Sequence, residues 1–527
     1  MKLAKSYAIS LMGLAGTQIE VEAEISSNLP NFVLVGLPDA SLSEAKDRVR
    51  AAIHNSGLEM PARRVTINLS PASVPKQGAS FDLAIAVAIL AANGVVKRDS
   101  VASAIHIGEL GLDGSIRRVA GVLPSLIAAV SAGFSRAIVP MANLEEARLA
   151  QGIEVVGAAH LAQVAKLHGA EIEFEPPSDE PINKVESPRA AQEFNSIDIA
   201  DVIGQEEAIS ALTVAAAGGH HLLMVGAPGA GKTMLAERLA TLLPDLPHAS
   251  AIETTAVYSI AGHRLVQNTG VDSLIVRPPF QAPHHTTSVT ALVGGGMGSP
   301  RPGLISLANH GVLFLDEAPE FQLPALESLR QPLESGEVVI NRSGGTARFP
   351  AHFQLVLAAN PCPCGHNTGR GKRCVCTQGQ KMRYATKLSG PLLDRVDIRL
   401  QIQSVAKAQL ALLKAEGHKN KSSAQLRETV TEARARAGAR LVGTPWSINA
   451  QVPGSYLRKH LRIDERVGQR LQKALEQGSI SMRGFDRCIR LTWTNADLAG
   501  RATPNEEDLA EAILLRGKEN PMEFGHA

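Results

Sequence analysis

The chain has 527 residues and carries 53 Lys and Arg against 51 Asp and Glu, a net charge of +2 at neutral pH. At roughly 100 to 200 residues per domain, this length predicts three or four domains. The composition excludes a disulfide framework, because four of the five cysteines lie within fifteen residues, and it excludes a membrane protein, because no apolar stretch reaches about 18 residues without charge or turn signals; a cytoplasmic location is expected.

Residues 1–172 are predicted to form an α/β domain. Strict alternation from Gln18 to Ile25 predicts a half-buried strand directly after the apolar N-terminal run, so that run is not a signal peptide. Further strands are expected at 65–69, 104–107 and 137–139, and helices at 81–92 and 123–132. Prolines among charged residues then predict a linker at 173–196.

One segment of this domain resembles the nucleophile segment of Lon-type proteases, which use a Ser–Lys dyad. It runs from Pro75 to Ser80 and places Ser80 at the nucleophile position, but Ser125 stands where that family has its lysine. A serine cannot act as the general base for another hydroxyl. The resemblance therefore implies a Lon-like (ribosomal S5 domain 2-like) fold without peptidase activity.

A nucleotide-binding α/β domain with a parallel sheet is predicted at 197–404. Residues 226–233 read GAPGAGKT, between an apolar strand at 221–225 and a helix at 234–240. This setting is that of a phosphate-binding loop, whereas a plain glycine-rich turn would not need the flanking strand and helix.

The chemistry of a phosphate loop assigns a role to each polar position. Glycines let backbone N–H groups face the phosphates at a helix N-terminus, the lysine adds charge for the β- and γ-phosphates, and the hydroxyl binds Mg²⁺. The ATP-binding candidates are Gly226, Gly229, Gly231, Lys232 and Thr233.

Two later strands end in polar residues that suit ATP hydrolysis. The strand at 311–315 ends in Asp316, a candidate ATP and Mg²⁺ ligand, and in Glu317, which can orient and deprotonate water. The strand at 355–359 ends in Asn360, placed to hydrogen-bond the γ-phosphate or the water. An apolar run that ends in Asp-Glu is a weak signal alone, but it is strong after a complete phosphate loop.

Two C-x-C pairs follow, formed by Cys362, Cys364, Cys374 and Cys376. Four thiolates on two turns suit tetrahedral Zn²⁺ in a structural site. Because C-x-C pairs are less diagnostic than C-x₂-C pairs, incidental or redox thiols remain the alternative. Basic residues near the second pair are candidates for contact with DNA phosphates: Arg370, Lys372 and Arg373. Cys488 is expected to be a core residue.

Several motifs together resemble the ComM/YifB family, which is related to the magnesium chelatase AAA+ ATPases, and the match covers nearly the whole chain. The motifs are PFQAPHHT at 279–286, GGG at 294–296, RPG at 301–303, NPCPCG at 360–365 and SGPLLDR at 389–395. Leu304 departs from the family, which commonly has an acidic residue there. That difference puts in doubt any role of charge at this position.

The resemblance implies a homohexameric ring with ATP at the subunit junctions. Arg395 is then the candidate arginine finger and Arg483 the candidate sensor-2 arginine, with Arg487 and Arg490 competing for the second role. The segment 279–310 is expected to be a loop that faces the central pore.

DNA contact is predicted at the pore loop and in the basic C-terminal part of the chain. His284 and His285 are the pore-loop candidates, and plain hydrogen bonding is the alternative for them. Residues 351–500 hold 25 Lys and Arg against 10 Asp and Glu, and residues 405–527 read as a helical lid domain. Such an excess indicates a polyanionic partner, although basic patches that meet acidic subunits are common. Because aromatic residues make up only 3% of the chain, backbone contact is favoured over base stacking.

The expected function is an ATP-dependent hexameric DNA motor, or helicase, that promotes branch migration during recombination and natural transformation. Its cofactors are ATP, Mg²⁺ and structural Zn²⁺, and it binds single-stranded or branched DNA with little regard to sequence. The alternative is a chelatase-like ATPase that remodels a partner or drives metal insertion; the chain has no integrin-like domain or acidic docking tail. An ATP-dependent peptidase is disfavoured because Ser80 lacks a base.

Overall fold

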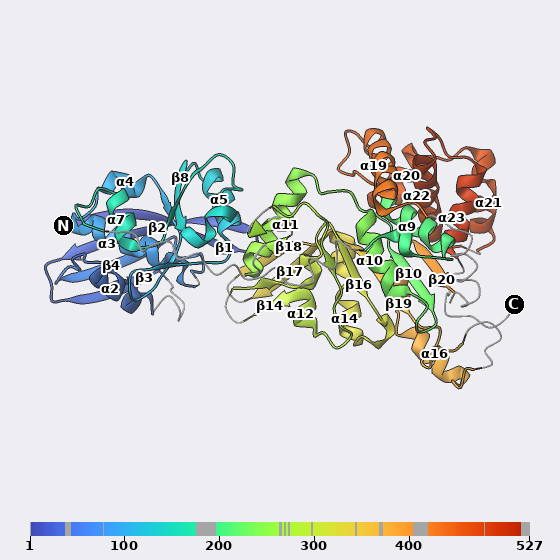
Figure 1. Ribbon diagram of the computed structural model, residues 1–527, viewed down its shortest axis with the longest axis horizontal. Helices are drawn as coiled ribbons and strands as arrows, with labels where there is room; N and C mark the ends of the chain where they lie inside the picture. The colour runs from blue at the N-terminus through green and yellow to red at the C-terminus, as the bar shows by residue number, and fades with distance from the viewer. Residues whose placement is uncertain are drawn as a thin grey trace.

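The computed structural model describes residues 2–36, 44–76, 78–174, 197–262, 266–267, 270–271, 274–296, 299–342, 345–367, 373–403, 420–478 and 480–517. Figure 1 shows an N-terminal α/β domain, a central α/β domain and a C-terminal group of helices in a row. The predicted linker lies outside the described residues from position 175 onward. No helix in the described ranges has the length and apolar character needed to cross a membrane.

A five-stranded parallel sheet forms the centre of the molecule, in the order β13-β16-β19-β10-β20. The strands are β10 (Leu222–Gly226), β13 (Phe280–Gln281), β16 (Val312–Leu315), β19 (Gln354–Ala359) and β20 (Ile398–Ile402). In doubly wound sheets, ligands bind beyond the carboxyl ends of the strands. Here β10, β16 and β19 end at the phosphate loop, at Asp316 and at Asn360 respectively, so the predicted site residues meet at one edge.

The helices around this sheet include α9 (Glu206–Gly218), α10 (Lys232–Leu242) and α11 (His248–Ala261). Helix α10 begins at Lys232 because Gly231 takes a left-handed conformation, with φ of 90°, which only glycine adopts at little cost. Short elements follow within the described residues: β11 (Val266–Gln267), β12 (Gly270–Val271), α12 (Val289–Val293), β14 (Gly294–Gly295), β15 (Arg301–Pro302), α13 (Leu304–Leu307), α14 (Leu323–Glu327), α15 (Arg330–Ser335), β17 (Glu337–Arg342), β18 (Gly345–Pro350), α16 (Gln378–Thr386) and α17 (Gly390–Leu393).

The prediction that 279–310 is one loop is wrong at both ends. Phe280 and Gln281 form strand β13, which pairs with Val312 and Leu313 of β16, and α13 is buried directly before β16. Stacking of Phe280 on Phe314, with ring centroids 6.0 Å apart, fixes this edge strand against its neighbour. The part of the segment outside the core therefore begins after Gln281.

The N-terminal domain contains a seven-stranded mixed sheet in the order β3-β4-β2-β1-β5-β8-β9. Its strands are β1 (Lys2–Met12), β2 (Ala15–Ser26), β3 (Asn31–Val35), β4 (Arg64–Ser70), β5 (Ile105–His106), β8 (Arg136–Pro140) and β9 (Glu154–Ala158), with the hairpin β6 (Glu109–Leu110) and β7 (Ile116–Arg117) beside it. Its helices are α2 (Ala45–Asn55), α3 (Asp82–Asn93), α4 (Arg98–Ala102), α5 (Val122–Ser131), α6 (Leu144–Ala147) and α7 (Leu161–Leu167). The strand expected at Gln18 to Ile25 is confirmed as part of β2, which pairs antiparallel with β1.

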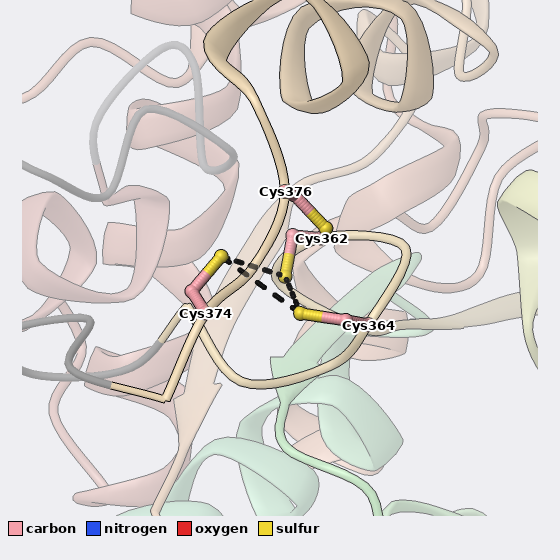
Figure 2. A group of neighbouring side chains, drawn as sticks. All are labelled: Cys362, Cys364, Cys374 and Cys376. Atoms are coloured by element: carbon pink, nitrogen blue, oxygen red, sulfur yellow. Dashed lines mark hydrogen bonds between the residues drawn. The ribbon is translucent and has the colours of Figure 1, made fainter.

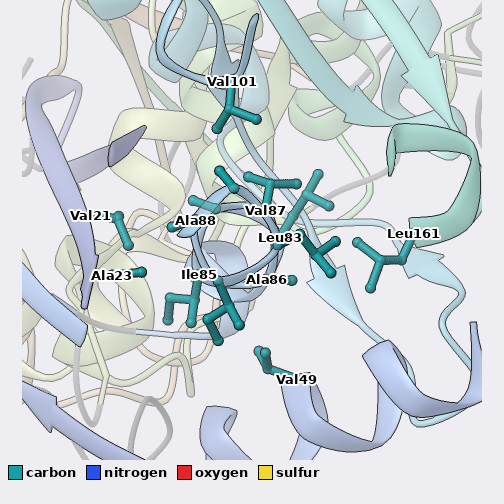
Figure 3. Close-up of a cluster of buried hydrophobic side chains, with 14 of the residues drawn as sticks. Val21, Ala23, Val49, Leu83, Ile85, Ala86, Val87, Ala88, Val101 and Leu161 are labelled. Carbon is teal, nitrogen blue, oxygen red and sulfur yellow. The ribbon is translucent and has the colours of Figure 1, made fainter. Parts of the chain in front are cut away.

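Helix α3 is the centre of this domain, and its apolar sequence explains why. Residues Leu83 to Ala92 are all buried, because the helix is apolar on every side and must be covered on every side. Figure 3 shows side chains from β2, α2, α4 and α7 around it, among them Val21, Val49 and Leu161.

Two predicted features of the Lon-like segment can be located. Ser80 lies in a short 3-10 helix (Ala79–Phe81), where its carbonyl accepts a hydrogen bond from Gly108 N–H. Ser125 is buried in α5. Among the described residues, no hydrogen bond joins the hydroxyl groups of these two serines, and the absence of peptidase activity stays a prediction.

A pair of buried histidines makes the N-terminal domain sensitive to acid. His106 Nε2 lies 2.9 Å from His168 Nε2, and Ser100 Oγ lies 2.9 Å from His168 Nδ1. Burial lowers the pKa of His106 to about 3 and that of His168 to about 4. Unfolded histidines protonate near pH 6.5, so the unfolded state binds more protons below that pH.

We therefore expect the domain to keep its full stability above pH 6.5 and to lose it as the pH falls towards 4. The loss is up to about 1.4 kcal/mol per pH unit for each histidine. Urea unfolding read by pulse proteolysis at pH 7 and pH 5 measures it. Replacement of both His106 and His168 by Gln should flatten the pH dependence, whereas exposed His54→Gln should not; equal pH dependence in all three proteins would contradict the assignment.

The N-terminal domain meets the central domain at α11 (Figure 1). Gly121 N–H at the start of α5 donates to the Ser259 carbonyl at 3.1 Å, and the Ser259 hydroxyl donates to the buried Glu146 carboxylate. A buried carboxylate is stable only when its hydrogen-bonding capacity is satisfied, so this contact fixes the position of the two domains at that point.

Residues 420–517 form a helical group that packs on α9 and α10. It contains α19 (Ser423–Arg440), α20 (Gly454–His460), α21 (Glu465–Glu476), α22 (Met482–Leu498) and α23 (Glu506–Arg516). The helix predicted at 406–416 lies outside the described residues. Cys488 is buried in α22, as expected of a core residue.

Candidate active site

The phosphate loop is held in place by the side chain of its own lysine. Lys232 Nζ donates to the carbonyls of Gly226 at 2.8 Å and Ala227 at 3.1 Å, and to Asn360 Oδ1 at 3.0 Å. Burial lowers the pKa of Lys232, while Asp316 and Glu317 oppose that shift. The loop and the end of β19 are therefore joined through one ammonium group that lies where phosphates would bind.

A second contact joins the start of α10 to the end of β16. Thr233 Oγ1 donates to Asp316 Oδ2 at 2.7 Å, and Glu317 N–H donates to Asp316 Oδ1 at 2.9 Å. A hydroxyl beside a carboxylate forms the oxygen-rich set that Mg²⁺ prefers. Thr233 and Asp316 thus fit the predicted magnesium site by the chemistry of their donor atoms.

Glu317 differs from Asp316 in its backbone conformation and in its side-chain contacts. Its φ of 49° is one of two positive φ values among non-glycine residues of the described chain, and strained backbone of this kind clusters at functional sites. Its side chain is about half exposed, and its Oε2 lies 3.6 Å from His285 Nδ1. Exposure leaves this carboxylate free to contact a water molecule, unlike the carboxylate of Asp316.

The two histidines predicted to contact DNA lie at this site. His284 and His285 pack against each other, with ring centroids 4.1 Å apart, and His284 Nδ1 lies 2.9 Å from Thr286 Oγ1. Whether either histidine touches DNA stays a prediction. The structure adds that His285 lies next to the candidate catalytic carboxylate, a proximity that the sequence did not indicate.

The candidate finger and sensor-2 arginines lie together in a different place. With Arg487 and Arg490, Arg395 and Arg483 line a cavity of about 230 Å³. Arg395 forms an ion pair with Glu334, and Arg483 Nη1 lies 3.0 Å from Asp394 Oδ2. Within the described part of the chain, no hydrogen bond or ion pair joins Arg395 or Arg483 to the phosphate loop.

Arg483 and Arg487 differ in burial and in their hydrogen bonds to the backbone. Arg487 is buried and donates to the Val396 carbonyl at 2.7 Å, whereas the side chain of Arg483 is 69% exposed. A buried guanidinium that satisfies a backbone carbonyl cannot leave without exposing an unpaired group. Arg483 is therefore the better placed of the two to reach a ligand.

The four cysteines form one cluster after β19 (Figure 2). Cys362 Sγ lies 3.3 Å from Cys364 Sγ and 3.7 Å from Cys374 Sγ, and the Sγ atoms of Cys364 and Cys374 are 3.8 Å apart. All four sulfurs, including that of Cys376, lie within 4.8 Å of one another. Tetrahedral zinc with Zn–S bonds of about 2.3 Å places its sulfurs about 3.8 Å apart, so the cluster has the size of a Zn²⁺ site.

The thiols of the cluster differ in acidity. Burial raises the pKa of Cys362 to about 12, whereas the backbone N–H groups of His366 and Val375 lower that of Cys364 to about 6. Metals bind thiolates, and Cys364 is the first of this pair to supply one. Of the basic candidates beside the cluster, Arg373 is described and Arg370 and Lys372 lie outside the described residues.

The cysteine cluster touches the phosphate loop directly. Gly365 has a φ of 75°, and a Cβ added there would lie 2.5 Å from Cδ of Pro228 in the loop. Asn360, which accepts the hydrogen bond from Lys232, is only two residues before Cys362. The turn that carries Cys362 and Cys364 thus contacts the loop through Gly365 and Pro228, and it follows directly on Asn360, which bonds Lys232.

We expect Gly365→Ala to weaken ATP binding by about tenfold. Overpacking costs about 1–3 kcal/mol, and about 1.4 kcal/mol corresponds to a factor of ten in affinity. Titration with a fluorescent ATP analogue measures the change. Gly262→Ala is the matched control, because Gly262 has a φ of 76° but nothing within 4 Å of the added Cβ; an equal loss in both variants would show that strain, not the Pro228 contact, is responsible.

Gln205 is a site residue for which the sequence gave no signal. Its Nε2 donates to the Ala230 carbonyl of the phosphate loop at 3.0 Å. A glutamine just before a helix has no local pattern that predicts such a contact. Gln205 lies before the phosphate loop in the sequence, whereas Asn360 lies after it. The hydrogen bond of Gln205 adds to the fixed backbone shape that phosphate binding requires.

Three models of protein families match the chain. Magnesium chelatase, subunit ChlI, matches residues 198–410, subunit ChlI of Mg-chelatase matches residues 21–143, and the C-terminal part of magnesium chelatase subunit ChlI matches residues 420–516. Together these matches cover most of both α/β domains and nearly all of the described C-terminal helices.

Some curated proteins are similar to this chain along nearly their whole length, and others over part of it. The competence protein ComM of Haemophilus influenzae is 41% identical, with 98% of this chain and 98% of ComM covered. The YifB protein of Escherichia coli is 39% identical, with 98% and 97% covered. The magnesium-chelatase 38 kDa subunit of Rhodobacter capsulatus is 29% identical over 30% of this chain and 49% of that subunit.

Proposed function

The chain belongs to the ComM/YifB family of magnesium chelatase-like AAA+ ATPases, and on that premise we propose that it is a DNA motor that uses ATP hydrolysis to promote branch migration during recombination and natural transformation. The ATPase activity in this proposal rests on two hydrogen bonds at one edge of the core sheet, from Lys232 to Asn360 and from Thr233 to Asp316. The name of the Haemophilus relative, a competence protein, supports the link to DNA uptake.

In the proposed reaction each polar group acts on one part of ATP. Lys232 and the loop N–H groups bind the β- and γ-phosphates, and Thr233 and Asp316 would hold a Mg²⁺ ion, which would neutralise phosphate charge. Glu317 takes a proton from the attacking water, which Asn360 helps to orient. His285 lies close enough to Glu317 to influence the orientation of its carboxylate.

The arginines complete the site from the neighbouring subunit of a hexameric ring. Arg395 and Arg483 line one cavity that contains no residue of their own phosphate loop, as expected of arginines that act in trans. Glu334 holds Arg395 until a neighbour supplies phosphate.

Mixing two inactive variants tests this arrangement. Lys232→Ala retains the arginines and Arg395→Ala retains the phosphate loop, so mixed rings should regain part of the ATPase activity that each variant lacks. No recovery in mixtures that light scattering shows to be hexameric would contradict action in trans.

Action on DNA is supported by the basic excess in residues 351–500. The deciding experiment measures ATP hydrolysis with and without forked DNA, and branch migration of a four-way junction, for the wild type beside Lys232→Ala. Stimulation by DNA and movement of the junction are expected only for the wild type. ATP hydrolysis at the same rate with and without DNA, together with no movement of the junction, would contradict the motor proposal.

A chelatase-like ATPase that remodels a partner protein is the second candidate. The similarity to the 38 kDa magnesium-chelatase subunit over 30% of this chain favours it. The same experiment separates the two, because a remodeller of a protein partner has no reason to respond to four-way DNA.

A further inference from the structure

We propose that helices α20 and α21 form a binding surface for single-stranded DNA. This inference rests on the proposed function as a DNA motor, and it assigns the DNA contact expected of the basic C-terminal part to two helices, apart from the pore loop and the cysteine cluster. The surface is defined by the exposed cations Lys459, Arg462, Arg466, Arg470 and Lys473 and by the rings of Trp446, Tyr456 and His460. Figure 1 places α21 at the outer end of the C-terminal helices.

The cations of α21 share one face of the helix. Arg466, Arg470 and Lys473 are spaced by four and three residues, which brings their side chains together on one side, and all three are exposed. Leu471 is buried, and Val467 packs on the apolar cluster of the C-terminal helices. The helix is therefore anchored by its apolar face and presents a row of positive charge outward.

These charges are not neutralised by the fold. Among the described residues, Lys459, Arg466, Arg470 and Lys473 take part in no ion pair, although Arg458 next to them is paired with Asp486. Residues 454–476 contain six Lys and Arg against three acidic residues. The carboxylate of Asp464 caps the N-terminus of α21, where it accepts a hydrogen bond from Arg466 N–H at 2.8 Å. A surface of unpaired like charge lowers its energy when it meets a polyanion.

Aromatic rings lie in and before helix α20, close in the chain to Lys459 and Arg462. Tyr456 stacks on His460, with ring centroids 4.5 Å apart and planes at 29°, and Trp446 meets Tyr456 edge-on at 5.0 Å. His460 is exposed, and Trp446 and Tyr456 are half-buried. The chain has only two tryptophans and four tyrosines, yet two of these six residues gather here.

The combination of rings and cations selects single-stranded DNA as the ligand. Cations alone fit any nucleic acid, but the exposed ring of His460 gains contact only with bases that are free of pairing, on which it stacks without regard to sequence. The low aromatic content of the whole chain favoured backbone contact over stacking, and the three rings at this surface lie within fifteen residues of one another in the sequence.

Fluorescence anisotropy with labelled oligo-dT of about 30 nucleotides, long enough to cover a single-strand site, tests the surface, using full-length protein with ATP present. In the triple variant Arg466→Ala, Arg470→Ala and Lys473→Ala, affinity should fall at least tenfold, and the slope of log K against log salt should decrease in magnitude by about 2, since each phosphate contact contributes about 0.7 on a single strand. In His460→Ala, affinity should fall about tenfold with no change in slope.

The matched control removes three exposed cations from the N-terminal domain, with Lys46, Arg50 and Arg63 changed to Ala, and should bind as the wild type does. Thermal unfolding checks that each variant is folded. If the α21 triple variant keeps the wild-type affinity and salt slope, the surface is wrong while the proposed motor stands. If the wild type itself binds no DNA, both the surface and the proposed function are wrong.

Discussion

Replacing Glu317 with glutamine is expected to reduce ATP hydrolysis by about 100- to 10,000-fold, the contribution of a positioned general base, while ATP binding is retained. The amide would keep the size of the side chain and its backbone conformation but could not accept the proton from water. The carboxylate is half exposed and free of Asp316, which is engaged with Thr233. Steady-state hydrolysis and binding of a fluorescent ATP analogue measure the two effects separately.

Glu320→Gln provides the control for this prediction. Glu320 is three residues further along the same loop, and its Oε2 is 3.4 Å from Lys387 Nζ at the surface, so its loss should leave hydrolysis nearly unchanged. Lys232→Ala, in contrast, should lose ATP binding itself. Hydrolysis that survives in Glu317→Gln at more than a tenth of the wild-type rate would show that another group activates the water.

The sequence was sufficient to place the core of this site. Lys232, Asp316 and Asn360 each follow an apolar run that reads as a buried strand, and the carboxyl ends of parallel strands meet at one edge of a sheet. Their contacts in the structure follow from that rule. The cluster of four cysteines was equally accessible, because its members are close in sequence and their spacing is set by short turns.

Contacts between segments far apart in sequence could not be predicted in the same way. The approach of His285 to Glu317, the pairing of Arg395 with Glu334 and the contact of Gly365 with Pro228 all depend on how loops fold back over the sheet edge. No periodicity encodes such contacts. Strand β13 was missed for a related reason, since a two-residue strand is too short to show alternation.

The cysteine cluster was predicted from the sequence, but its contact with the phosphate loop was not. Cys362 is two residues from Asn360, and Gly365 of the same turn rests on Pro228 of the phosphate loop. A metal ion that fixes Cys362 and Cys364 would therefore hold both the hydrogen-bond partner of Lys232 and one wall of the loop.

We therefore expect the purified protein to contain about one Zn²⁺ per chain and to lose it in the double variant Cys364→Ser and Cys374→Ser. Structural zinc contributes on the order of 10 kcal/mol in small zinc domains, so a lower unfolding temperature should accompany its loss. ATP affinity should also fall, by at least tenfold, because Asn360 and Pro228 would lose their support. Elemental analysis, thermal unfolding and ATP titration measure the three effects.

Cys488→Ala is the matched control, since Cys488 is buried in α22 away from the cluster, and it should retain the metal and the ATP affinity. The combination of results separates two roles for the cluster. Loss of zinc with unchanged ATP affinity would show that the turn stabilises only itself. Loss of zinc together with weaker ATP binding would support action of the metal through the hydrogen bond of Asn360 to Lys232 and the contact of Gly365 with Pro228.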